Sequence, residues 1–87
     1  MHAVVVKVTI NEPEAALREL REQVVPRVSQ APGFLNGYWT RKDDTGLSMI
    51  LFESEDAATR ASEMIPTTVP EYVTLEGVEV REVLAQA

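Results

Sequence analysis

The chain has 87 residues, of which 45% are hydrophobic, so it is long enough for one small globular domain spanning 1–87. Its 14 acidic and 8 basic residues give a net charge of −6, which opposes binding to nucleic-acid phosphates and to anionic membrane surfaces. The absence of cysteine excludes disulfides, thiol nucleophiles and thiolate metal sites.

The first residues lead directly into a run of β-branched residues, without the basic and apolar segments of a signal peptide. No apolar run approaches the length of a membrane-spanning helix. We therefore expect a cytoplasmic protein that binds neither nucleic acid nor membranes.

The segment Ala3–Ile10 is dominated by valine and isoleucine, and this composition predicts a β-strand. Alternation places Val4, Val6, Val8 and Ile10 on one face of that strand. Lys7 is a lone charge on the opposite face, where it either lines a barrel interior or extends to an open end.

A helix is predicted next, with Asn11 as its N-cap and Glu14 completing a capping box. An apolar stripe at helical spacing follows, formed by Leu17, Leu20, Val24 and Val28. Pro26 interrupts the backbone pattern while Val28 stays in phase, so we expect a kinked helix that ends near Ser29 or Gln30.

The stretch from Ala31 to Glu53 predicts a β-hairpin. Pro32 and Gly33 form a turn, and the strand Phe34–Lys42 follows. The polar segment 43–46 then supplies a loop of two or four residues before the strand Leu47–Glu53, with Trp39 expected opposite Ile50.

Both faces of this hairpin carry apolar side chains, because alternation divides them between the two sides. One face is predicted to hold Leu35, Gly37, Trp39, Arg41, Ser48, Ile50 and Phe52. The other is predicted to hold Phe34, Asn36, Tyr38, Thr40, Leu47, Met49 and Leu51. A sheet with one face in water would show polar residues on that face, so both faces need a cover.

Ser54 is placed to cap a second helix, whose narrow apolar stripe of Ala58, Ala61 and Ile65 predicts close packing against the sheet. Pro66 ends this helix. The segment 66–77 is predicted to be a connection, and Val78–Leu84 to be a polar edge strand.

The element order is therefore βαββαβ, the α+β ferredoxin-like arrangement with an antiparallel four-stranded sheet. Right-handed crossovers place both helices on one face of that sheet. The other face is apolar and has no helix of its own, so we expect a homodimer formed through the sheet faces.

The segments PGFLNGYW and LFESEDAA, joined by a short hairpin, resemble the antibiotic biosynthesis monooxygenase (ABM) family of the dimeric α+β barrel superfamily. The resemblance spans nearly the whole chain and implies two sheets that close into a barrel, with a ligand cavity between each sheet and its own helices. Haem-degrading relatives use a histidine on the second helix as the iron ligand. Residues 55–65 contain no histidine, so haem degradation is not expected.

Cofactor-free monooxygenases of that family hold a phenolic substrate with asparagine, tryptophan and tyrosine. Asn36, Tyr38 and Trp39 are the same residue types on one strand and are our candidate ligand-binding residues, although alternation turns Trp39 away from the other two. Ordinary sheet packing is the alternative role of Tyr38 and Trp39, and a strand irregularity that of Asn36. His2, the one histidine, is predicted to be a partly exposed terminal residue without a catalytic role.

Two functions follow. The first is binding of a small hydrophobic or aromatic molecule between sheet and helices, and the alternative is a cofactor-independent monooxygenase that oxidises an aromatic or quinol substrate. A module that serves dimerisation alone is a third possibility, which predicts no cavity. We expect neither a metal nor an organic cofactor, because no set of histidine, cysteine or spaced acidic residues converges in the sequence.

Overall fold

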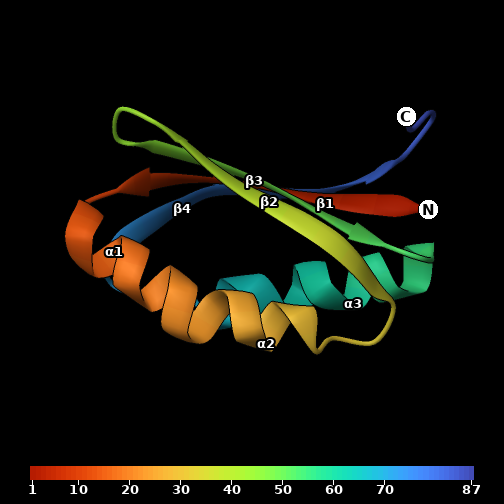
Figure 1. Cartoon of the computed structure of the whole chain (residues 1–87), viewed down its shortest axis with the longest axis horizontal. Coiled ribbons are helices and arrows are strands. Elements are labelled where there is room, and N and C mark those ends of the chain that lie inside the picture. Colours follow the sequence, from red (N-terminus) through yellow and green to blue (C-terminus); the bar gives the residue numbers. More distant parts are fainter.

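The computed structural model describes all residues 1–87 and contains one antiparallel sheet with two helical segments on one face (Figure 1). The first half comprises β1 (His2–Ile10), α1 (Pro13–Glu19), a π-helical segment (Leu20–Val24) and α2 (Val25–Ser29). The second half comprises β2 (Phe34–Lys42), β3 (Thr45–Phe52), α3 (Glu55–Met64), a 3-10 turn (Ile65–Thr67) and β4 (Val73–Glu82). The strand order β2-β3-β1-β4 confirms the ferredoxin-like βαββαβ fold.

The segment 13–29 stays helical through Pro26, and its end at Ser29 confirms the prediction. The expected kink takes the form of a π turn, in which the N–H of Val25 donates to the carbonyl of Leu20. A π turn adds one residue to the helical repeat directly before a proline that cannot donate a hydrogen bond. No helix of the molecule has the length and the apolar character needed to cross a membrane.

The predicted N-cap at Asn11 is wrong. Glu12 occupies the N-cap position and makes no side-chain capping bond. The Asn11 side-chain amide donates instead to the hydroxyl of Thr74 at 3.1 Å, and its backbone N–H donates to the carbonyl of Tyr72 at 2.8 Å. These two hydrogen bonds hold the chain just before α1 against the start of β4.

The β2–β3 hairpin has the shorter of the two predicted loops, and its predicted pairing is wrong. Only Asp43 and Asp44 form the loop, since Asp43 adopts the left-handed conformation with φ 55°, which aspartate tolerates better than most residues. Trp39 consequently pairs with Ser48 instead of Ile50. The shift is two residues, so the faces assigned to these side chains do not change.

The faces predicted for Phe34 and Leu35 are wrong, because the pairing of β2 with β3 shifts between Phe34 and Asn36. Leu35 is the extra residue of this irregularity. The shift turns Phe34 toward the helices, where its ring meets that of Phe52 edge to face at a centroid distance of 6.2 Å.

The last strand begins at Val73, so the prediction of a connection up to residue 77 is wrong. The register of β1 against β4 shifts between Lys7 and Val8, which leaves Glu76 as an extra residue. The apolar residues that face the helices are Val73 and Leu75 before the bulge and Val78 and Val80 after it. The bulge therefore breaks the alternation that identifies a strand.

The core lies between the sheet and α3. Its buried members come from the inner face of the sheet, which is the face toward the helices, and from one alanine of α3: Val4, Val6, Ile50, Phe52 and Ala58. The predicted cap is confirmed, since the hydroxyl of Ser54 accepts the N–H of Ala57 at 3.1 Å. Small alanines on this side let α3 approach the sheet closely.

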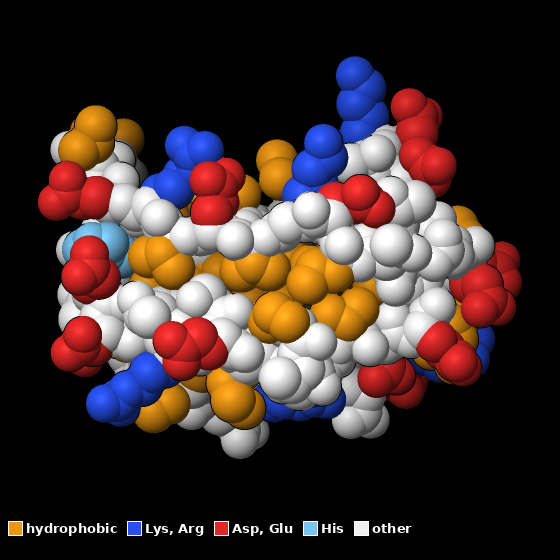
Figure 2. Space-filling model, turned by 180° about the vertical axis from the view of Figure 1, so that it is seen from behind, with side chains coloured by type: hydrophobic (Ala, Val, Ile, Leu, Met, Phe, Trp, Pro, Cys, Tyr) orange, Lys and Arg blue, Asp and Glu red, His pale blue; other side chains and the backbone are white.

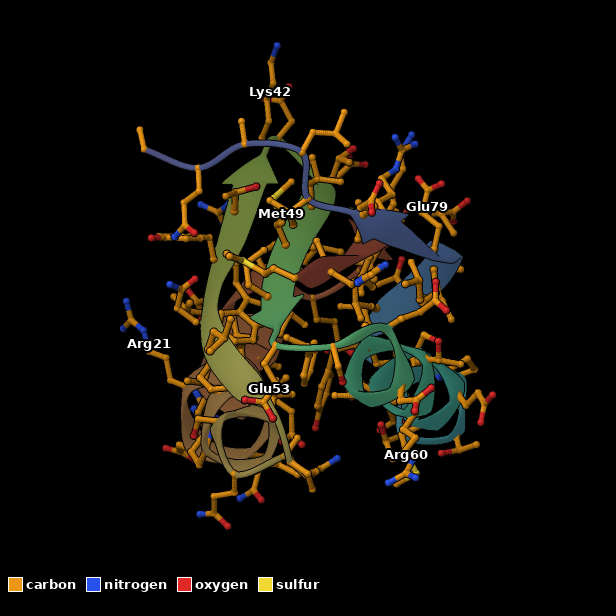
Figure 3. All side chains as sticks on the ribbon, turned by 90° about the vertical axis from the view of Figure 1, so that its right-hand side faces the viewer. Arg21, Lys42, Met49, Glu53, Arg60 and Glu79 are labelled. Atoms are coloured by element: carbon orange, nitrogen blue, oxygen red, sulfur yellow. The ribbon has the colours of Figure 1, made fainter.

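The outer face of the sheet, which points away from the helices, remains open. Its middle is apolar, and its β4 edge carries Glu79 and Arg81. The outer face carries Val5, Tyr38, Leu47, Met49 and Leu51, and Met49 lies on this side in Figure 3. Tyr38 is 62% exposed and Met49 47% exposed. Lys7 is also exposed on this face.

We predict that Gly33→Ala lowers the free energy of unfolding by about 2 kcal/mol or more, because Gly33 has φ +81° and an added Cβ would lie 2.7 Å from the Cβ of Ala57. Urea-induced unfolding followed by circular dichroism measures this loss. Gly77→Ala is the matched control, since no atom lies within 4 Å of its added Cβ, and its change should stay within about 0.5 kcal/mol. Equal effects of the two substitutions would contradict the structure of this turn.

Candidate ligand-binding cavity

An open cavity of about 890 Å³ lies between the inner face of the sheet and the helical segments. Hydrophobic residues make up 19 of the 34 that line it, so its wall is mainly apolar. Its volume falls within the roughly 300–1,000 Å³ that is usual for small-molecule sites.

The cavity exists because the two helical segments on this face of the sheet, 13–29 and α3, do not pack against each other. α3 contacts β1, β3 and β4, whereas α2 contacts β2, and contacts between the two helical segments are few. The predicted apolar stripe of Leu17, Leu20, Val24 and Val28 lines the cavity along its whole length. Leu17 at one end of this stripe is 43% exposed, whereas Val28 at the other end packs against the core.

The opposite wall is formed by α3 and β4. Half-buried apolar side chains line this wall: Ala61, Ile65, Val73 and Leu75. Figure 2, which views this side of the molecule, shows hydrophobic side chains gathered along its middle and acidic side chains around them.

Trp39 lies on the inner face of β2 and lines the cavity. Its six-membered ring edge lies over Gly37, where an added Cβ would be 3.0 Å from two ring carbons. Gly37 therefore gives the indole room to lie along the strand, and the half-buried ring forms part of the cavity floor.

Polar groups are few on the floor, and they stand together. Ser48 pairs with Trp39 across the hairpin, and Arg41 follows two residues after Trp39 on the same face. None of these three side chains forms a hydrogen bond or an ion pair within the protein. Each is a hydrogen-bond donor available to a bound molecule.

The acidic groups of the cavity lie elsewhere. Glu53 and Asp56 line the end where β3 passes into α3, and Figure 3 shows Glu53 between the ends of α2 and α3. Glu19 belongs to α1. Of the lining arginines, Arg41 lies at the end nearest the Asp43–Asp44 loop, the hairpin end, whereas Arg27 and Arg60 belong to α2 and α3. Glu53 and Asp56 lie at the opposite end.

The three candidate ligand-binding residues do not come together. Trp39 lines the cavity, whereas Asn36 and Tyr38 lie on the outer face of the sheet, as alternation requires. Arg41 and Ser48 were not among the candidates, although alternation already assigned both to the face of Trp39. A single arginine and a single serine form no sequence motif, so the sequence alone did not indicate that they line a ligand site.

His2 lies outside the cavity lining. Its Nε2 is 3.5 Å from a carboxylate oxygen of Glu55, and its Nδ1 is buried without a hydrogen-bond partner. No three side chains among the histidines and acidic residues come close enough to hold a metal ion.

The solved structure of the haem degrader MhuD from Mycobacterium tuberculosis, with two haems bound in its active site, is similar to this chain. The TM-score is 0.55 and the sequence identity 21%, over 97% of this chain and 98% of that chain. No protein-family model and no curated protein matches the sequence. At this identity the likeness supports the ferredoxin-like fold, and it does not extend to the activity.

We predict that Gly37→Ala displaces the indole of Trp39 from the cavity floor, because the added Cβ would be 3.0 Å from its ring carbons. Trp39 is the only tryptophan, so its fluorescence emission and its indole N–H resonance report the move directly. Stability should change by less than about 1 kcal/mol, since the ring edge can yield into open space. An unchanged indole resonance would contradict this contact.

Proposed function

We propose that this chain binds a small hydrophobic or aromatic molecule in the cavity between its sheet and its helices. The observation that carries the proposal is an open cavity of about 890 Å³ with a mainly apolar wall in a chain of 87 residues. A domain this small gains stability by filling such a space, because uncovered apolar side chains contribute little to folding. An apolar ligand supplies the contacts that the helices do not make.

The indole of Trp39 favours an aromatic ligand. Flat rings stack on one another in offset or edge-to-face arrangements, and each such pair contributes about 0.5–1.5 kcal/mol beyond the burial of its area. The aliphatic side chains of Leu20, Val24 and Ile50 cover the rest of a ring system without demanding hydrogen bonds.

Haem, the molecule bound by MhuD, does not fit the side chains of this cavity. Haem iron in proteins is held by histidine, cysteine or tyrosine, or by a histidine and methionine pair. None of the lining residues is a histidine, a cysteine or a tyrosine. His2 lies at the end of β1, beside Glu55, and is not part of the wall.

A cofactor-independent monooxygenase is the alternative. That chemistry needs polar groups that hold a phenol and its oxygenated form, a role for which Asn36 and Tyr38 were candidates. Both side chains belong to the outer face, so of the three candidate residues only Trp39 lines the cavity, with Ser48 and Arg41 as its polar neighbours on the floor. Binding without turnover is therefore the function that the geometry supports better.

We predict that 1,5-dihydroxynaphthalene binds the purified protein and that Val24→Phe weakens binding about tenfold, because the larger ring occupies the cavity and a ligand must displace it. Isothermal titration calorimetry measures the affinities. Gln23→Phe is the matched control, since Gln23 is exposed and does not line the cavity.

The same experiment carries a test of catalysis. An oxygen electrode follows the protein and the dihydroxynaphthalene in air-saturated buffer. Steady oxygen uptake that Val24→Phe abolishes would establish the monooxygenase, whereas binding without uptake supports the binding protein. Absence of binding by the wild type would contradict both functions.

We further propose that two copies of the chain associate through the outer faces of their sheets. The accessible surface is 5898 Å², whereas a monomeric protein of this 9.7 kDa mass exposes roughly 5,100 Å². The exposed apolar side chains Leu47, Met49 and Tyr38 lie together on that face. The tail after β4 leaves the sheet on the same side (Figures 1 and 3) and carries Leu84, which is 89% exposed.

We predict that the wild type sediments as a dimer at micromolar concentration and that Met49→Glu sediments as a monomer. Met49 pairs with Val5 and Tyr38 at the centre of the apolar part of the outer face, where association would bury a carboxylate at a cost in free energy. Gln23→Glu adds the same charge on an exposed helical position and should remain dimeric. A wild-type monomer in analytical ultracentrifugation would overturn the proposed association.

A further inference from the structure

We propose that the ligand is an aromatic acid whose carboxylate binds at the hairpin end of the cavity, to Arg41, Ser48 and the indole N–H of Trp39. The inference rests on the proposed binding function and adds the chemical class of the ligand and its orientation. The aromatic body then lies toward the apolar middle of the cavity, over the indole ring.

The register of the hairpin places the three residues next to one another on the cavity floor. Trp39 and Ser48 are direct cross-strand partners, whose Cβ atoms lie about 4.5–5.5 Å apart in an antiparallel sheet. Arg41 is two residues from Trp39, about 7 Å along β2 and on the same face. A single carboxylate bound on this face can therefore contact side chains of both β2 and β3.

The chemistry of the three groups selects an anion. Arginine and the tryptophan N–H donate hydrogen bonds and accept none, and the serine hydroxyl can also donate. Arg41 forms no ion pair within the protein although the chain carries 14 acidic residues, so its guanidinium is free to bind an external carboxylate. A planar guanidinium matches the two oxygens of a carboxylate.

The position of Arg41 on the cavity floor sets the direction of the ligand. Arg41 pairs with Gly46 near the start of β3, whereas Glu53 follows the end of that strand. Seven residues of extended chain separate Gly46 from Glu53, a distance of about 23 Å. Arg27 and Arg60 belong to the helical walls, so Arg41 is the only cation on the cavity floor.

Glu19 is the acidic group that could compete for Arg41, since both line the cavity. It forms no ion pair with Arg41 or with any other arginine. The Glu19 side chain is half-buried on α1, on the wall opposite the floor. The three donors of the floor therefore remain available.

The test compares 2-naphthoic acid with its neutral methyl ester by isothermal titration calorimetry on the wild-type protein. We expect the ionised acid to bind about fivefold more tightly than the ester, a modest factor because Arg41 is exposed and solvent screens its charge. Arg41→Gln should remove this preference and leave the affinity for the ester unchanged. Ser48→Ala should reduce it by about twofold.

Two arginine controls fix the position of the anion. Arg60→Gln removes a cation from the α3 wall of the same cavity, and Arg21→Gln removes one that points away from the cavity (Figure 3). Both variants should retain the preference for the acid. The indole N–H resonance of Trp39 should shift more with the acid than with the ester, since only the carboxylate accepts its hydrogen bond strongly.

The outcomes separate this inference from the proposed function. Equal affinity for acid and ester, or a preference that survives Arg41→Gln, would overturn the carboxylate site and leave the aromatic binding function intact. A preference lost in Arg60→Gln but not in Arg41→Gln would likewise overturn it. Absence of binding by both compounds would overturn the binding function and this inference together.

Discussion

The sheet of this protein has two apolar faces, and its two helical segments cover only one of them. The exposed apolar surface of the chain follows from that imbalance. A four-stranded sheet buries its side chains when a second layer lies on each face, because water on an apolar face costs free energy in proportion to the exposed area. One layer of helices leaves the outer face with Met49 and Tyr38 uncovered.

The helices also cover the inner face of the sheet incompletely, and the cavity lies in the part that they leave uncovered. α3 lies close to the sheet because Ala58 is small and fully buried, whereas the longer first segment presents Leu20 and Val24 to open space. The π turn before Pro26 belongs to this open side. Such turns are common at functional sites, and here the turn carries two residues of the cavity wall.

Few side chains are buried in the chain on its own, and this links binding to stability. Any molecule that binds the folded state alone raises the free energy of unfolding by mass action. An aromatic ligand in the cavity and a second copy on the outer face would each cover apolar surface that the monomer leaves exposed. In the proposed function, folding is therefore coupled to ligand binding through the apolar side chains of the cavity, and to association through those of the outer face.

The sequence by itself determined the element order, the cap at Ser54, the apolar stripe of the first helix and the side of the hairpin on which Trp39 lies. These features depend on local periodicity and on turn chemistry, which are written in neighbouring residues. The tertiary structure decided the rest: the bulge at Glu76 that hid half of β4, the use of Asn11 to hold β4, and the two-residue hairpin loop. It also decided that the helices stand apart and that Arg41, Ser48 and Trp39 lie on one cavity floor. Both outcomes depend on how the strands pair and how the helices pack on the sheet, which the spacing of residues along the chain does not specify.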